Sequence, residues 1–235
     1  MPLPKLKHKL FDLTVPSTKQ EIQFRPFLVA EEKVLLLTQE GTPKEVMDSV
    51  RQVINNCIVT EGVFVENMTT FDLEYIFIKM RARSINNIVE LTYRDLDDDK
   101  RYEVTVDLDE IEVKYDDTHT NKIDIDDNLG MIMKYPSADL STIVEDGVDE
   151  VESFMRILRH CIDKIWEGDE VHEVSQYTEE EVVEFIESLD VKTFQKIQTF
   201  FDTMPKIRHE VSYTNSLGTE KTIPLTSLAD FFTLG

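Results

Sequence analysis

Residues 89–115 of the chain read VELTYRDLDDDKRYEVTVDLDEIEVKY. Apolar side chains alternate with charged or polar ones across 102–108, and the alternation resumes at 111–115. A period of two places one set of side chains on each face of a strand. The stretch therefore predicts antiparallel strands with one solvent-exposed face, continued by a further pair around 123–125 and 131–133.

Helical patterns lie on both sides of these strands. Apolar residues recur every three or four positions in 31–39, 43–58, 69–83, 148–165, 178–189 and 194–201. Thr42 before Pro43, and Thr178 three residues before Glu181, are typical helix starts. Strand patterns occupy 19–27, 207–213 and 219–225, and a short apolar helix is expected at 227–232. We expect an α+β protein, an antiparallel β-meander flanked by helices, with a small C-terminal helix-hairpin-helix unit.

Charge suggests where the chain divides. Residues 145–190 contain 16 acids and three bases, which is more than half of the net charge of −22. We therefore expect an N-terminal α+β domain with the meander at 1–145. Residues 146–235 are expected to form an acidic helical region that ends in a β-hairpin and a short helix.

The net charge also limits the classes of partner. A chain with 47 acids and 25 bases repels nucleic acid and anionic membranes, so neither is an expected partner. The charge favours solubility and attraction to a basic protein. No apolar run approaches the roughly 20 residues that span a bilayer. The first 13 residues lack the apolar core of a secretory signal. The chain is thus expected to act where it is made.

The sequence contains none of the common motifs of catalytic or phosphate-binding sites. His-Glu-x-x-His, Gly-x-Ser-x-Gly and glycine-rich phosphate loops are absent. Residues 124–128 resemble the start of a calcium-binding EF-hand loop, but Leu129 replaces the required glycine and Tyr135 the required glutamate. The aspartates of 95–99 fail in the same way. Cys57 and Cys161 are expected to be buried free thiols. We therefore expect no catalytic residues, no metal and no cofactor.

Two segments of the chain carry motifs that are typical of one protein family. The first runs from Thr14 to Lys33, where a short strand ends in Arg-Pro-Phe and leads into an acidic helix start. The second begins with Phe200–Pro205 and continues through 207–213, the Gly218 turn and Leu225–Phe232. The matching residues of the first segment are Arg25, Pro26, Phe27, Glu31, Glu32 and Lys33. Through these residues, and through the order of elements between the two segments, the chain resembles the baseplate hub and hub-assembly proteins of T4-like contractile-tailed bacteriophages.

The resemblance implies a non-enzymatic role in tail morphogenesis, as a baseplate hub subunit or a hub assembly chaperone. Implied partners are other baseplate hub proteins, with the tape-measure protein as a further candidate. The implied locations are the host cytoplasm during assembly and the virion tail baseplate. Some similar proteins carry Cys-x-x-Cys-Gly in the last hairpin, a zinc-binding pattern. Here Thr214, Asn215, Ser216 and Leu217 precede Gly218. The hairpin is therefore expected to be held by packing alone, through Tyr213, Leu225 and Phe231.

Three sets of residues are candidates for partner binding. They are the Arg25-Pro26-Phe27 segment, the acidic helical face with Glu179, Glu180, Glu184 and Glu187, and the aromatic pair Phe231 and Phe232. Exposed aromatic residues often mark interfaces, although a small core is the other interpretation of the last pair. An alternative function is an acidic inhibitor that imitates nucleic acid and blocks a host DNA-binding enzyme. That function would require a continuous stripe of carboxylates across the surface.

Overall fold

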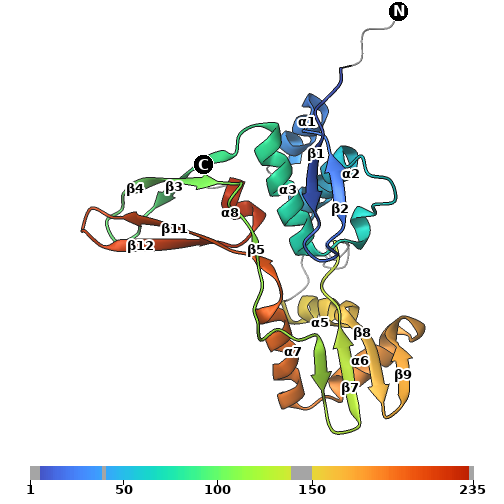
Figure 1. Ribbon diagram of the computed structural model, residues 1–235. Helices are drawn as coiled ribbons and strands as arrows, with labels where there is room; N and C mark the ends of the chain where they lie inside the picture. Colours follow the sequence, from blue (N-terminus) through green and yellow to red (C-terminus); the bar gives the residue numbers. More distant parts are fainter. Residues whose placement is uncertain (1–5, 39–40, 139–149, 233–235) are drawn as a thin grey trace, which may run out of the picture. The chain divides into compact units, whose positions relative to one another are not determined.

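The computed structural model describes residues 6–38, 41–138 and 150–232 (Figure 1). The chain divides into two compact units, one formed by Met1–Lys114 with Lys206–Gly235 and the other by Tyr115–Pro205. Each unit combines helices with small antiparallel sheets, which confirms the α+β class.

This grouping differs from the expected division into 1–145 and 146–235, whose boundary lies outside the described residues. The C-terminal hairpin groups with the N-terminal part of the chain, because its first strand lies beside a strand more than 100 residues earlier in the sequence. Such a contact leaves no mark on local charge or periodicity.

The first unit contains most of the strands found in the described residues. Its elements are β1 (Phe11–Thr14), β2 (Glu21–Phe24), α1 (Val29–Thr38), α2 (Pro43–Cys57), the 3-10 helix η1 (Val65–Asn67), α3 (Thr70–Ser84), β3 (Ile88–Arg94), β4 (Arg101–Asp107), β5 (Val113–Lys114), β10 (Lys206–Ile207), β11 (His209–Thr214), β12 (Glu220–Leu225) and α8 (Leu228–Phe232).

Capping boxes start the two long helices of this unit. The Thr42 hydroxyl accepts from the Glu45 N–H at the start of α2, as expected, and Thr69 with Asp72 does the same for α3. Asp72 is fully buried, and its carboxylate also accepts from the Ser17 N–H at 2.9 Å and the Ser17 hydroxyl. One aspartate thus caps α3 and ties the β1–β2 turn to it.

The predicted alternating strands form, but they do not join in one meander. Within the described residues, β1–β2, β3–β4, β5–β10 and β11–β12 are separate two-stranded antiparallel pairs. In the β5–β10 pair, Val113 lies opposite Ile207 and Lys114 opposite Lys206. The expected strands near 123 and 131 belong to the second unit.

The second unit is a four-stranded antiparallel sheet packed with helices (Figure 1). Its elements are β6 (Lys122–Asp124), β7 (Leu129–Met133), α5 (Glu150–Cys161), β8 (Ile162–Glu167), β9 (Glu170–Glu173), the 3-10 helix η2 (Val174–Gln176), α6 (Glu179–Glu187) and α7 (Val191–Thr203). The sheet order is β6-β7-β8-β9. Its core joins sheet residues such as Met131 to helix residues such as Leu158, Ile186 and Phe200.

One predicted helix is too long. The apolar pattern at 148–165 predicts helix up to Ile165, whereas α5 ends at Cys161 and β8 begins at Ile162. The first residue of that pattern, Val148, lies outside the described residues. Pairing of β8 with both β7 and β9 overrides the local helical spacing, because the sheet supplies backbone partners on both edges of the strand.

Both cysteines are buried free thiols, as predicted. Burial raises the pKa of Cys57 to about 11 and that of Cys161 to about 12. Both side chains are therefore neutral near pH 7 and pack as small apolar groups.

Candidate partner-binding site

Two hairpins of the first unit pack together into an arm, which we define as β3–β4 with β11–β12 and their turns (Figure 1). Both hairpins bury alternate residues, including Leu91 and Val104 on one and Val211 and Leu225 on the other. Farther along, the Tyr213 ring lies 4.8 Å from that of Tyr102, measured between centroids. The inner faces of the arm are thus aliphatic at one end and aromatic toward the turns.

The two turns of the arm differ by one residue in length but begin with similar hydrogen bonds, at Asp95 and at Asn215. The Asp95 N–H donates to the Lys100 carbonyl at 2.9 Å, and the Asn215 N–H donates to the Thr219 carbonyl at 3.0 Å. Each side-chain oxygen accepts the N–H two residues later, at 2.8 Å for Asp95 and 3.1 Å for Asn215. Each turn therefore forms an Asx turn that fixes its backbone.

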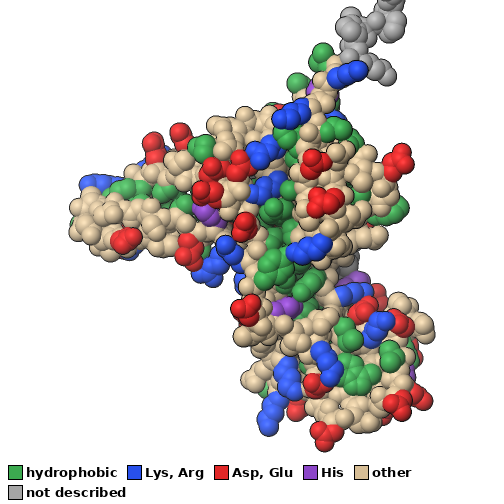
Figure 2. All heavy atoms as spheres, viewed as in Figure 1, with side chains coloured by type: hydrophobic (Ala, Val, Ile, Leu, Met, Phe, Trp, Pro, Cys, Tyr) green, Lys and Arg blue, Asp and Glu red, His purple; other side chains and the backbone are tan. Residues whose placement is uncertain are grey.

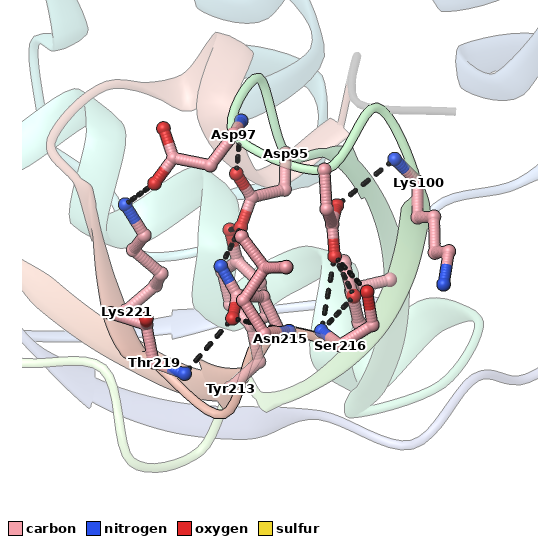
Figure 3. Close-up of polar contacts among 11 residues, drawn as sticks. Asp95, Asp97, Lys100, Tyr213, Asn215, Ser216, Thr219 and Lys221 are labelled. Atoms are coloured by element: carbon pink, nitrogen blue, oxygen red, sulfur yellow. Dashed lines mark hydrogen bonds and ion pairs between the residues drawn. The ribbon is translucent and has the colours of Figure 1, made fainter.

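Side-chain hydrogen bonds join the two turns (Figure 3). Asp95 accepts from the Asn215 amide at 3.1 Å and from the Tyr213 hydroxyl at 2.9 Å. Asp98 accepts from the Ser216 N–H at 3.0 Å and from its hydroxyl at 2.7 Å. We call these contacts, together with the Asp97–Lys221 ion pair, the clasp.

Two clasp carboxylates, Asp95 and Asp98, have lowered pKa values and are ionised at neutral pH. Hydrogen bonds, first from the Tyr102 hydroxyl and then from Ser216, hold the pKa of Asp98 well below its ordinary value. The Asp97 N–H, with lesser contributions from Tyr213 and Asn215, lowers the pKa of Asp95. Charged acceptors make stronger hydrogen bonds than neutral ones, so ionisation strengthens the clasp.

Apolar side chains point outward at the tip of the arm. The tip is the pair of turns that the clasp joins, where Leu96 is 84% exposed and Leu217 is 67% exposed. Asp95 and Asn215 beside them are only 3% and 4% exposed. Turns that are held by internal hydrogen bonds and present leucines to solvent are suited to insertion into a partner's apolar pocket.

The clasp also corrects the expectation that packing alone holds the last hairpin. Tyr213 and Leu225 do pack inside the arm, and Phe231 is fully buried in the same unit. In addition, Asn215 and Ser216 bond to the 95–98 turn. The run of aspartates and the Asn-Ser-Leu-Gly turn could have signalled two Asx turns, but nothing in the sequence pairs them.

The Arg25-Pro26-Phe27 segment is built into the first unit. The Arg25 guanidinium forms an ion pair with Glu31 at 2.9 Å, and its hydrogen bond lowers the pKa of that carboxyl. Phe27 is 9% exposed, packs against Phe77, and donates its N–H to the Ser84 hydroxyl at 2.8 Å. These contacts anchor the segment to α3.

The other two candidate sets differ in accessibility. Phe231 is fully buried, which places it in the core interpretation, and the Phe232 side chain lies outside the described residues. All four glutamates of the acidic face are exposed: Glu179, Glu180, Glu184 and Glu187. The second unit contains 23 acids and seven bases, a net charge of −16, so this face lies in the more acidic unit.

A surface cavity of about 260 Å³ lies beside the acidic face. Its walls include Lys134, Arg159, His160 and Tyr177. The Arg159 guanidinium pairs with Glu179 at 3.3 Å, so the charge of Glu179 is partly compensated. Glu180, Glu184 and Glu187 make no such ion pair within the described residues and carry the uncompensated charge of the face.

The alternative function, imitation of nucleic acid, requires a continuous stripe of carboxylates, which can be looked for in Figure 2. On the face it shows, carboxylates are scattered over each unit among basic and uncharged groups, without a continuous stripe.

Among the described residues, no three His, Cys, Asp or Glu side chains are grouped to hold a metal ion. In the same part of the chain, no helix combines the length and apolarity that crossing a bilayer requires.

Comparison with known proteins gives one family. A family model described as T4 bacteriophage base plate protein matches residues 8–233, nearly the whole chain. Neither the curated proteins nor the solved structures include a significant match.

Proposed function

Because the chain belongs to the family of T4 bacteriophage base plate proteins, we propose that it is a hub subunit or a hub assembly chaperone that acts by binding other proteins. Family membership gives it a structural or assembly role in the phage baseplate, and so a place in the virion tail or its formation. The proposal adds that the protein catalyses no reaction and that it acts first in the host cytoplasm, during assembly.

The observation that carries the proposal is the tip of the arm. The clasp engages the side chains of Asp95, Asp97 and Asp98 in one turn and of Asn215 and Ser216 in the other. It leaves Leu96 and Leu217 in solvent. Exposing two leucines on ordered turns is unfavourable in an isolated protein, because their burial would contribute roughly 1.5–3 kcal/mol each. A partner that covers them recovers this free energy without ordering a flexible loop.

The proposed partners are other baseplate hub proteins and the tape-measure protein. The acidic face is a second contact region in this proposal, because uncompensated glutamates accelerate encounter with a basic partner surface. Its contribution would be chiefly to the association rate, whereas the leucines would slow dissociation.

Binding assays with purified proteins test the proposal. Each hub protein and the tape-measure protein of the same phage are titrated against the wild type and a Leu96→Ser/Leu217→Ser variant. We expect at least a tenfold loss of affinity in the double variant. Leu6→Ser is a matched control, because Leu6 is 80% exposed and lies outside helices and strands.

Three outcomes bear on the proposal. Equal affinity of the wild type and the double variant would remove the tip from the binding site. Failure of the wild type to bind any of these proteins would overturn the proposed function. Mass spectrometry of mature virions then separates the two roles, since a subunit stays in the particle and a chaperone leaves.

A further inference from the structure

Strand β3 has one paired edge and one open edge. It pairs with β4 over all seven of its residues, and no strand within the described residues pairs with its other side. Residues Asn87 and Asp95, which flank β3, both bond to the β4 side of the hairpin. The Leu108 N–H donates to the Asn87 carbonyl at 2.7 Å, and the Asp95 N–H donates to the Lys100 carbonyl at 2.9 Å.

These two bonds fix which backbone groups face outward. Bonded pairs alternate along an antiparallel ladder, so the odd-numbered residues from 87 to 95 bond across to β4. The even-numbered residues therefore direct their N–H and C=O groups to the open edge. The Ile88 N–H is already used by the Asn86 side chain at 3.2 Å, which leaves Glu90, Thr92 and Arg94.

The open edge has few of the features that normally prevent strand addition. Residues 88–94 are IVELTYR, rich in β-branched and aromatic residues and without proline. Glu90, Thr92 and Arg94 have exposed side chains, whereas Leu91 on the other face is buried. One face of the strand therefore packs inside the arm and the other faces solvent.

The other hairpin of the arm shows what a protected edge looks like. There the Asn215 N–H bonds to the Thr219 carbonyl, so the same alternation directs Glu220, Thr222 and Pro224 outward from β12. Pro224 has no N–H to donate, which interrupts the edge. The outward edge of β12 is thus interrupted by a proline, whereas that of β3 is not.

We infer that the open edge of β3 binds an extended segment of a partner protein, which adds as a third strand beside β3. This inference rests on the proposed function and specifies the form of the partner segment. Backbone bonds to Glu90, Thr92 and Arg94 would provide affinity, as in other cases of strand addition. The matching segment is four to six residues long, has β-branched residues facing Thr92, and carries a base opposite Glu90.

Proline substitutions test the inference. Thr92→Pro removes an outward N–H and leaves the bonded pairs of the β3–β4 ladder in place. Thr222→Pro is the matched control, at an outward position of the already interrupted β12. Purified hub proteins and the tape-measure protein of the same phage serve as probes. We expect at least a tenfold loss of affinity for Thr92→Pro and no change for Thr222→Pro, with unchanged circular dichroism.

A second measurement needs no variant. Hydrogen–deuterium exchange of the wild type should show fast exchange at the amides of Glu90, Thr92 and Arg94 when free, and at least tenfold slower exchange in the complex. Unprotected amides in a complex that does form would overturn strand addition and leave the proposed function standing. A wild type that binds no probe would overturn both. A wild-type dimer that Thr92→Pro converts to a monomer would make the occupant a second copy and refute the partner segment.

Discussion

Asn215 donates a 3.1 Å hydrogen bond to Asp95, although 120 residues separate them and each is almost completely buried. The same two residues each start an Asx turn. This amide–carboxylate contact, together with the other contacts of the clasp, joins two similar turns and holds the leucines of the tip in place.

Replacing Asn215 with alanine should loosen the tip. The change removes one of the donors to Asp95 and deprives the Leu217 and Thr219 N–H groups of their side-chain acceptor. An unsatisfied buried polar group typically costs about 1–3 kcal/mol. Chemical denaturation should show this loss, and exchange at the amides of 95–98 and 215–219 should accelerate. Ser212→Ala, at an exposed position of the same hairpin, is the control. A stability equal to wild type would show that the clasp contributes nothing.

Gly130 should not tolerate a side chain. It lies opposite Trp166 in the β7–β8 ladder, and an added Cβ would collide with the indole ring and lie 2.7 Å from the Ile123 carbonyl. Gly130→Ala should lose about 1–3 kcal/mol of unfolding free energy through overpacking. Combining it with Trp166→Leu should recover part of that loss. Thermal unfolding of both variants measures the effect, and an unchanged Gly130→Ala midpoint would contradict it.

Glu74 should make stability depend on pH. Burial, with a smaller contribution from the charge of Asp230, raises the pKa of this α3 carboxyl from 4.5 to about 7. The folded state therefore holds a proton that the unfolded state releases, and unfolding free energy should fall between about pH 4.5 and pH 7. Glu74→Gln should flatten this slope and gain about 3 kcal/mol at pH 8. Glu66→Gln, at an exposed position, should leave the slope intact.

Phe231 should contribute to the stability of the first unit and not to partner binding. Its ring is fully buried, so Phe231→Ala should cost about 3–5 kcal/mol, the usual range for a large buried aromatic side chain. At a temperature where the variant stays folded, its affinity for hub proteins should equal that of the wild type. A loss of affinity without a loss of stability would return Phe231 to the partner-binding candidates.

The acidic face should affect association more than stability. Changing Glu180, Glu184 and Glu187 together to glutamine should slow association with a basic hub protein and weaken its dependence on salt. Stability should stay within about 0.5 kcal/mol, because these side chains are exposed. Stopped-flow measurements at two salt concentrations check this. A matched control removes the same charge at exposed sites of the first unit: Glu61, Glu66 and Glu110.

Local signals in the sequence predicted local structure well. Thr42 caps α2 as expected, and Thr178 caps α6 with the expected capping box, because the chemistry of a cap lies within four residues. The alternation at 102–108 became β4 for the same reason. The β-hairpin at 209–225 also formed as expected, with its turn at Gly218.

Contacts between distant segments were not predictable from one sequence. Ile162 and Ile165 continue a helical spacing, and only the flanking strands β7 and β9 make them part of a strand. Asp95 and Asn215 each look like residues of a solvated turn until the hairpins are seen together. The exposure of Leu96 and Leu217 follows from that pairing, so the tip could not be identified beforehand.

The short β5–β10 pair has a consequence for how the gene could tolerate change. Lys114 and Lys206 are ladder neighbours, so the chain departs from the first unit and rejoins it at nearly the same point. The 91 residues between them form an insertion between two paired strands, at a position where a short turn would also connect the backbone. The second unit could therefore be lengthened, exchanged or shortened in evolution while the first unit, including the arm, kept its fold.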